Sequence, residues 1–349
     1  MENKKFFIRV ESDEKIGTGH LMRCLTIANS LRKKGNQVYF ISKNMSEESR
    51  KILESNKFSV EKLDYKRKKF DYKIDAKYTI EIIKKEMKNS TFLIIDNYDI
   101  DKKWEILVKK FVKKIIVIDD LANRKHSCEL LIDQNFNSNI KEKQYKKLVP
   151  KNCTLLTGTK FAILRPEFFI LRKLTKTRTK LKNILISYGG TDPSNETIKV
   201  LKALKNIDLQ NVNTYIVSGN LNSKNKEIEQ LSTELNKSKF YEYTKDIAEL
   251  MIKADVAFGG AGTTSWERCC LGLPTIITIL SNDQKDIAES LEKNTCGINL
   301  GFGKNIKVKD YENILRKFDW KNLREFSLNC KKIVDGRGTN RVISEILSI

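Results

Sequence analysis

Short runs of β-branched and aromatic residues alternate with longer polar stretches along the first half of the chain. The runs are continuously apolar, which is typical of strands covered on both faces, and they occupy residues 6–10, 37–42, 91–96, 114–119 and 129–133. The polar stretches favour helices at residues 21–34, 46–56 and 76–89, the first with a glycine stop at Gly35. This order predicts a parallel sheet with right-handed crossovers and helices on both faces.

A second series of the same kind begins at residue 183. Its expected strands lie at residues 183–190, 213–219, 239–244, 254–260 and 274–280, and its helices begin near residues 193, 224, 264, 283 and 308. Residues 166–182 are charged, lack glycine and show no strand pattern, so we interpret them as an interdomain connection. The pattern predicts two Rossmann-like, doubly wound α/β domains, at residues 1–165 and 183–349, with ligands in an interdomain cleft at the carboxyl ends of the strands.

The charge balance narrows the choice of partners. The 349 residues include 66 Lys+Arg and 44 Asp+Glu, a formal net charge of +22, and 40% are hydrophobic. That composition excludes a disordered or collagen-like chain. The lysines are dispersed among acidic and amide residues, so a solvated surface is favoured over nucleic-acid binding. The excess charge can still attract a polyanionic small molecule.

Membrane and export signals are absent from the sequence pattern. The longest apolar runs, such as Ile115–Ile118 and Ile276–Leu280, are far shorter than the roughly 18 residues that span a bilayer. The apolar stretch near the first residue is too short for a signal peptide. We therefore expect a cytoplasmic protein without stable membrane insertion. No heptad or long apolar stripe indicates an oligomeric interface.

Candidate metal ligands do not form a recognisable motif. The seven cysteines are dispersed without a CxxC pair, which argues against disulfides or structural zinc and predicts reduced thiols in the core. Asp119 and Asp120 are adjacent, but no further His or carboxylate cluster completes a metal shell. We expect Asp119, Asp120, Asp96 and Asn97 to cap the segments that follow them or to hydrogen-bond a sugar rather than to bind a metal. We expect no bound metal.

The loop from Ile16 to Arg23 follows the first expected strand and contains one of only two histidines. Gly17 and Gly19 let the backbone approach a ligand, and the following helix directs N–H groups at an anion. The loop is neither a Walker A nor a dinucleotide motif. His20 at a helix start is biased toward the neutral imidazole, which can take a proton from water as a general base; local capping or packing is the alternative. We take His20 as catalytic and Gly17, Gly19 and Arg23 as substrate-binding candidates.

Two glycine turns in the second half, at residues 187–193 and 259–267, each lead into an expected helix. Such turns offer backbone N–H groups and hydroxyls to phosphate oxygens, and two in one domain indicate a diphosphate site. Glu267, about one helical turn in, can accept hydrogen bonds from a ribose diol or simply complement the helix dipole. The candidate diphosphate residues are Gly190, Thr191, Gly262, Thr263, Thr264 and Ser265.

Two amides and the second histidine complete the polar candidates. Asn282 and Gln284 lie where the strand at 274–280 turns into a helix, and can bind sugar hydroxyls or cap that helix. His126 lies in a charged loop and is interpreted as a surface or structural residue. No Gly-x-Ser-x-Gly elbow is present, so serine-hydrolase chemistry is unsupported.

Five segments carry specific motifs in a fixed order: IGTGHLMRCL, VIDDLANRKHSCELLIDQN, LLTGTKFAILRPEF, ISYGGTDPSN and GGAGTTSWERCCLGLPTI. They closely resemble the UDP-sugar hydrolases of pseudaminic acid biosynthesis, and the resemblance extends from Arg9 to the final helix. Members of that family convert UDP-2,4-diacetamido-2,4,6-trideoxy-β-L-altropyranose to UDP and the free sugar. The resemblance implies a GT-B fold, similar to that of the bacterial lipid II N-acetylglucosaminyltransferase, no metal or cofactor requirement, and a link to flagellin glycosylation.

The resemblance also implies residue roles. The family's catalytic histidine falls on His20, its UDP-binding turn on Gly262–Ser265 and its ribose-binding glutamate on Glu267. Tyr98 matches a tyrosine close to the catalytic histidine. The first strand departs from the family pattern, since Glu11 stands where an aspartate is usual, and its longer side chain weakens any substrate contact assigned to that position.

The reaction implied by the resemblance is attack of water on the anomeric carbon, with His20 as the general base and UDP as the leaving group. Helix N-termini at the glycine turns can stabilise the departing diphosphate without a metal. Three alternatives remain open at this point. They are a GT-B glycosyltransferase that passes the sugar to an acceptor, a hydrolysing UDP-sugar 2-epimerase, and a module that binds UDP-sugars or nucleic acid without catalysis.

Overall fold

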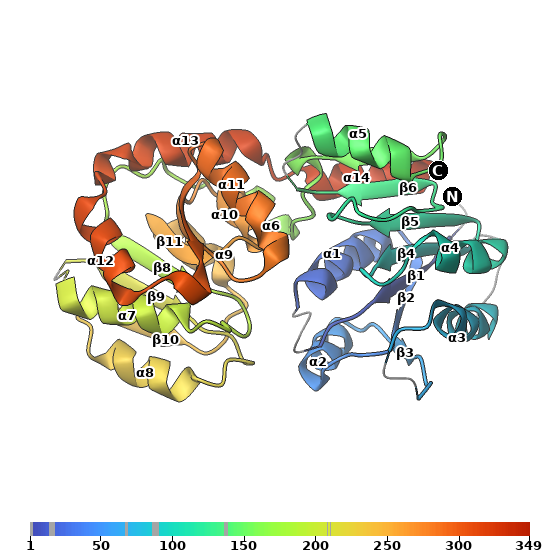
Figure 1. Cartoon of the computed structure of the whole chain (residues 1–349), viewed down its shortest axis with the longest axis horizontal. Helices are drawn as coiled ribbons and strands as arrows, with labels where there is room; N and C mark the ends of the chain where they lie inside the picture. Colours follow the sequence, from blue (N-terminus) through green and yellow to red (C-terminus); the bar gives the residue numbers. More distant parts are fainter. Residues whose placement is uncertain are drawn as a thin grey trace. The chain divides into compact units, whose positions relative to one another are not determined.

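The computed structural model describes residues 3–13, 18–66, 69–85, 91–135, 139–207, 209 and 211–349. The chain divides into two compact units, which we call the first and the second unit (Figure 1). Residues 1–163 and 337–349 form the first unit, and residues 164–336 form the second. Each unit is built around its own parallel sheet with helices on both faces, which confirms the predicted fold class.

Among its described residues, the first unit has seven parallel strands in the order β3-β2-β1-β4-β5-β6-β7. Because β1 lies between β2 and β4, the direction in which successive strands are added reverses beside β1. In doubly wound sheets ligands bind at this switch point. The strands are β1 (Lys5–Val10), β2 (Gln37–Ser42), β3 (Val60–Lys62), β4 (Thr91–Asp96), β5 (Lys114–Ile118), β6 (Leu130–Asp133) and β7 (Thr154–Thr157).

Helices cover both faces of this sheet, and β1 shows why its sequence has no polar alternation. Phe6, Ile8 and Val10 belong to the core cluster that includes α1 and α14, whereas Phe7 belongs to the opposite cluster with Trp104 of α4. The helices are α1 (Gly19–Lys33), α2 (Glu47–Ser55), α3 (Tyr72–Lys85), α4 (Lys102–Val108), α5 (Asn139–Leu148) and α14 (Gly338–Ser348), with short 3₁₀ turns η1 (Lys109–Phe111) and η2 (Thr159–Phe161).

The second unit has six parallel strands within its described residues, in the order β10-β9-β8-β11-β12-β13. Its first strand, β8, pairs with both β9 and β11, so this sheet also has a switch point beside its first strand. The strands are β8 (Asn183–Ser187), β9 (Asn213–Val217), β10 (Ser238–Tyr241), β11 (Val256–Gly260), β12 (Thr275–Ile279) and β13 (Gly297–Phe302).

Eight helices lie in the described part of the second unit. None of the described helices of the chain combines the length and the apolar character needed to cross a bilayer. The helices are α6 (Pro166–Arg172), α7 (Glu196–Ile207), α8 (Asn225–Thr233), α9 (Ile247–Lys253), α10 (Thr264–Cys270), α11 (Lys285–Lys293), α12 (Val308–Lys317) and α13 (Leu323–Ile333), with 3₁₀ turns η3 (Asn282–Gln284), η4 (Gly303–Asn305) and η5 (Trp320–Asn322).

The units are bounded differently from the segments expected from the sequence. Part of the expected connection forms α6, which packs against α9 and α10 within the second unit. The last helix, α14, returns to the first unit, where Val342, Ile343 and Ile346 join the core cluster of α1. An amphipathic helix packs on whichever apolar surface complements it, and its position in the sequence does not reveal which sheet that is.

Candidate functional site

His20 lies in the first turn of α1, directly after the β1 loop. Its Nδ1 is 2.6 Å from Oδ1 of Asp96, the last residue of β4. The two residues meet because β1 and β4 pair in parallel, with Val10 beside Asp96, so both chain segments leave the sheet at the same edge. The His20 side chain is 13% exposed and Asp96 is fully buried. The structure thus places His20 at the switch point of the first sheet.

The contact with Asp96 determines which His20 nitrogen is available. A separation of 2.6 Å between a ring nitrogen and a carboxylate oxygen needs a proton between them, so the Nδ1–H of His20 donates to Asp96. In a neutral ring Nε2 then carries the lone pair. None of the described residues forms a hydrogen bond with Nε2. His20 is therefore oriented to accept a proton at Nε2.

Arg23, one turn further along α1, holds Asp96 in place. Its Nε and Nη2 donate to the two carboxylate oxygens of Asp96, each at 2.6 Å, and its Nη1 donates to Asp120 at 3.1 Å. Burial favours a raised pKa for Asp96, but the charge of Arg23 and the hydrogen bonds from Arg23 and His20 outweigh it and hold that pKa well below its usual range. Arg23 is buried, and its guanidinium N–H groups already donate to Asp96 and Asp120. We therefore interpret Arg23 as a positioning residue rather than as the substrate contact expected from the sequence.

Tyr98 and Asp120 form the other side of this cluster. The Tyr98 hydroxyl donates to Asp120 at 2.7 Å, and its ring lies edge-on to the His20 ring with centroids 4.8 Å apart. Burial, followed by the charge of Asp120, raises the pKa of Tyr98 above its usual range, so this hydroxyl stays protonated. The proximity of Tyr98 to His20 agrees with the expectation from the family resemblance. We call His20, Arg23, Asp96, Tyr98 and Asp120 the histidine cluster.

The first glycine turn of the second unit is arranged differently from the expectation. The helix begins at Glu196 rather than near Pro193, and the Asp192 carboxylate accepts the N–H groups of Glu196 and Thr197, both at 2.8 Å. The helix start that was expected to bind phosphate is thus occupied by the chain's own carboxylate. Gly190 and Thr191 precede this cap at the end of β8, and retain only their own backbone and hydroxyl groups for a ligand.

The second glycine turn follows β11, at the switch point of the second sheet. The hydroxyls of Thr263 and Thr264 have no hydrogen-bond partner among the described residues, whereas the buried Ser265 hydroxyl accepts from Arg268 at 3.1 Å. Gly262 is partly exposed at the turn. Gly259 must lack a side chain, since a Cβ there would lie 2.6 Å from the Ser187 carbonyl oxygen. Of the expected residues, Gly262, Thr263 and Thr264 are thus open to a ligand, and Ser265 supports the turn.

Glu267 lies on the first turn of α10 beside Arg165. Its Oε1 is 3.7 Å from Nη2 of Arg165, whose Nη1 lies 3.0 Å from Glu167. Burial raises the pKa of Glu267 to about 7, although Arg165 and Arg268 oppose the shift. The Glu267 side chain is 20% exposed to solvent. Arg165 precedes α6 and lies in one of the five segments of the family resemblance, but was not singled out as a site residue.

The two amides have different surroundings. Oε1 of Gln284 accepts the N–H groups of Ala261 at 3.1 Å and of Leu280 at 3.2 Å, so this side chain braces the second glycine turn against the end of β12. It forms no side-chain cap of α11. Asn282 is exposed at the start of η3. Neither Asn282 nor Gln284 therefore caps α11 through its side chain, which was the alternative to binding sugar hydroxyls.

Gly17 lies outside the described residues. The structure does describe three other residues discussed from the sequence, Gly19, Glu11 and His126. Gly19 is the first residue of α1. Glu11 is buried at the end of β1, where it pairs with Arg9 at 2.6 Å and accepts the N–H groups of Lys43 and Asn44. His126 is buried, not on the surface, and its Nδ1 is 2.6 Å from Glu105. These contacts assign structural roles to Glu11 and His126.

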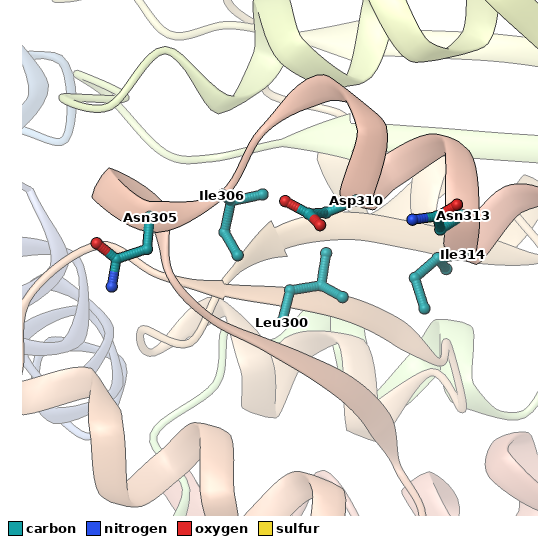
Figure 2. Close-up of a pocket in the computed structure, with 6 residues that line it drawn as sticks. All are labelled: Leu300, Asn305, Ile306, Asp310, Asn313 and Ile314. Atoms are coloured by element: carbon teal, nitrogen blue, oxygen red, sulfur yellow. The ribbon is translucent and has the colours of Figure 1, made fainter.

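A shallow pocket of the second unit lies apart from these candidates. It is lined by Leu300 of β13, Asn305 and Ile306 at η4, and side chains of α12 (Figure 2). The close-up shows Asp310, Asn313 and Ile314 on α12, with Leu300 and Ile306 as the other apolar side chains. None of the lining residues is among the predicted site residues, so the pocket adds nothing to the candidate site.

Comparisons with known proteins agree with this architecture. Residues 184–328 match the glycosyltransferase family 28 C-terminal domain. The chain is 29% identical over 357 residues to the uncharacterized protein MJ1062 of Methanocaldococcus jannaschii, covering 98% of this chain and 70% of that protein. It is 27% identical over 250 residues to the UDP-2,4-diacetamido-2,4,6-trideoxy-beta-L-altropyranose hydrolase of Campylobacter jejuni, covering 71% of this chain and 81% of the hydrolase.

Similarity to solved structures establishes the fold. The crystal structure of MurG from Acinetobacter baumannii superposes with a TM-score of 0.69 at 14% identity, covering 99% of this chain and 100% of MurG. The chain therefore has the GT-B fold that the sequence resemblance implied.

Proposed function

We propose that this protein is an enzyme that hydrolyses UDP-2,4-diacetamido-2,4,6-trideoxy-β-L-altropyranose to UDP and the free sugar. The observation that carries the proposal is the His20–Asp96 pair at the switch point of the first sheet, with Nε2 unpaired among the described residues. The Campylobacter relative named for this hydrolase activity supports the choice of substrate. The glycosyltransferase domain match over residues 184–328 supports a glycosyl donor on the second unit.

In the proposed reaction, Nε2 of His20 removes a proton from water as the water oxygen attacks the anomeric carbon. The bond between that carbon and the UDP oxygen breaks, and the electron pair leaves with UDP. The imidazolium that forms is balanced by the charge of Asp96, which accepts a hydrogen bond from Nδ1–H and is itself fixed by Arg23. Positioned base catalysis of this kind typically contributes about 10²–10⁴ in rate.

The second unit is proposed to hold the UDP moiety. The N–H groups at the start of α10 and the hydroxyls of Thr263 and Thr264 offer hydrogen bonds to the diphosphate oxygens. The ionised carboxylate of Glu267 accepts hydrogen bonds from the two ribose hydroxyls. These donors stabilise the leaving diphosphate, so the proposed step requires no metal ion.

The test is to incubate the protein with this UDP-sugar in ¹⁸O-labelled water, without an acceptor and with a chelator present. We expect stoichiometric release of UDP, with the label on the sugar and the configuration at C2 unchanged. Label in UDP would place the cleavage at phosphorus and contradict the mechanism. Inversion at C2 would identify a hydrolysing 2-epimerase instead.

A glycosyltransferase is the second candidate, because the family 28 domain match names that activity. A transferase passes the sugar to an acceptor and releases UDP only slowly in water. If UDP release from the same substrate stays at the uncatalysed rate until an acceptor sugar or lipid is added, the transferase replaces the hydrolase. A shift of UDP release with added DNA or RNA is not expected, because the basic residues form no compact block in the sequence.

A further inference from the structure

Three cysteines that are far apart in the sequence meet in the core of the second unit. Cys269 lies on α10, Cys296 immediately precedes β13 and Cys330 lies on α13. Their sulfur atoms all lie within 4.8 Å of one another, and none of the three is in a disulfide. Each residue is at most 2% exposed. We call these residues the thiol cluster. The cluster forms where α10 packs on α13 and α11 packs on β13. The spacing of these cysteines in the sequence does not predict it.

The spacing of the sulfur atoms suits a thiophilic metal ion. With metal–sulfur bonds of about 2.3 Å, three thiolates around one ion lie roughly 3.8–4.0 Å apart. Sulfur atoms already within 4.8 Å reach that spacing with shifts below about 1 Å each. Among the described His, Cys, Asp and Glu side chains, no fourth group joins the set. Three soft ligands without a hard oxygen donor favour ions such as Cu(I), Zn²⁺ or Cd²⁺ over Mg²⁺ or Ca²⁺.

Two buried arginines supply positive charge next to the thiol cluster. Arg268 adjoins Cys269 in the sequence, and the Arg178 N–H donates to Ser327, one turn before Cys330 on α13. The guanidinium of Arg178 donates to the carbonyls of Met251, Ala254 and Leu271.

Neither guanidinium forms a salt bridge with a carboxylate among the described residues. Arg268 donates instead to Gly260 and Ser265. Burial lowers the pKa of Arg178 to about 10 and that of Arg268 below its usual range, as expected for cations that lack a full counter-charge. The two buried guanidiniums therefore supply positive charge beside the thiol cluster.

We propose that the thiol cluster binds one thiophilic metal ion through the sulfur atoms of Cys269, Cys296 and Cys330. Each sulfur donates an electron pair to the ion and its S–H proton, where present, passes to solvent, so binding involves no oxidation. With a divalent ion the tris-thiolate complex carries one negative charge, which the guanidiniums of Arg178 and Arg268 balance. The ion joins α10, the β13 entry and α13, and thereby stabilises the second unit.

The experiment is a Cd²⁺ titration of the full chain, reduced with a thiol-free phosphine and freed of metal by a chelator. We expect an ultraviolet thiolate-to-cadmium charge-transfer band that saturates at one ion per chain, and a rise in Tm of several degrees, since an ion that binds only the folded state stabilises it. Mg²⁺ should produce neither effect. Absence of the charge-transfer band from the wild-type protein would overturn the proposal, whatever the variants do.

Single substitutions Cys269→Ser, Cys296→Ser and Cys330→Ser should each reduce the band by at least half and remove the Tm rise, with folding verified by circular dichroism. Cys270→Ser is the matched control, since Cys270 is buried on the same helix but its sulfur is not part of the thiol cluster. The unrelated thiol pair Cys128 and Cys153, 3.7 Å apart in the first unit, provides a second control. If the band survives Cys296→Ser but disappears with Cys128→Ser, the metal binds that pair and the proposal is wrong.

Discussion

At the scale of single residues, the hydrogen bond between His20 and Asp96 assigns the proton on the imidazole ring. It places the proton on Nδ1 and leaves the lone pair on Nε2, where it can accept a proton from water. Arg23 binds both oxygens of Asp96, so the carboxylate cannot rotate away from the ring. This chain of contacts gives His20 one orientation and one tautomer, as a general base requires.

Replacing His20 by Asn should remove the base and leave the UDP site intact. We expect His20→Asn to lower kcat by about 10²–10⁴-fold, while the Kd for UDP changes by less than about twofold. Single-turnover kinetics and calorimetric UDP binding measure the two quantities. A comparable loss of UDP affinity would identify His20 as a ligand contact.

Replacing Asp96 by Asn should disturb the tautomer of His20 without deleting the ring. We expect Asp96→Asn to lower kcat by at least about tenfold with little change in UDP affinity, because an uncharged amide can turn its NH2 to Nδ1 and favour the other tautomer, and does not balance the imidazolium charge. Asp120→Asn is the control, since Asp120 accepts hydrogen bonds from Arg23 and Tyr98 but none from His20. An equal loss of kcat in both variants would show that only the cluster's charge balance matters.

We predict that Glu267 makes UDP binding sensitive to pH. Its pKa of about 7 means that the carboxyl group is mostly neutral at pH 6 and mostly ionised at pH 8. If the ionised form accepts the ribose hydroxyls, UDP affinity rises with pH across this range, by up to about tenfold. The wild-type affinity should be divided by that of Glu267→Gln at each pH, so that titration of UDP itself cancels. A ratio that is constant between pH 6 and 8 would contradict this role.

Part of the candidate site could be predicted from residues near each other in the sequence. A glycine loop before a helix identified His20, and the glycine turn after β11 identified Thr263 and Thr264. Asp96 was interpreted only as a cap or a sugar contact, because its pairing with His20 depends on β1 lying beside β4. Strand order in a parallel sheet is set by crossovers between distant segments, and no local pattern specifies it.

At the scale of elements, helix starts in the second unit differ in what they offer a ligand. Asp192 caps α7 with its own carboxylate, whereas α10 has no side-chain cap at its start. The sequence predicted both helices from their glycine turns. It could not distinguish them, since the cap requires positive φ angles at Asp192 and Asn195 that their residue types permit but do not demand.

Removing the α7 cap should cost stability. We expect Asp192→Ala to lower the free energy of unfolding by about 1–2 kcal/mol, because two N–H groups of α7 lose their acceptor. Asp192→Asn keeps one of the two acceptor oxygens and tolerates the positive φ, so it should lose less. Urea unfolding of both variants measures the difference. Equal stability of Asp192→Ala and wild type would show that the cap contributes nothing.

At the scale of the whole molecule, α14 ties the end of the chain to the first unit. Val342, Ile343 and Ile346 are buried in the same core cluster as Phe6 and Ile8 of β1. The alternating strand and helix pattern predicted two sheets correctly, but assigned this helix to the second one. Its apolar face fits either sheet in composition, and only the packing partners decide.

Truncating one of these side chains should affect the two units unequally. We expect Ile346→Ala to destabilise the first unit by about 2–5 kcal/mol, because a fully buried side chain leaves a cavity. Amide hydrogen exchange should accelerate in Lys5–Val10 and stay unchanged in Asn183–Ser187. The exposed Ser344→Ala serves as control. Equal acceleration in both strands would mean that the units unfold together.

The return of α14 also sets an order of events during translation. All residues of the second unit leave the ribosome before residues 338–348 do. The nascent first unit therefore carries an uncovered apolar surface throughout that interval, although most of it was synthesised earlier. Domains usually fold in the order of their synthesis. Here the second unit can complete its folding first, and we expect chaperones to bind the incomplete first unit.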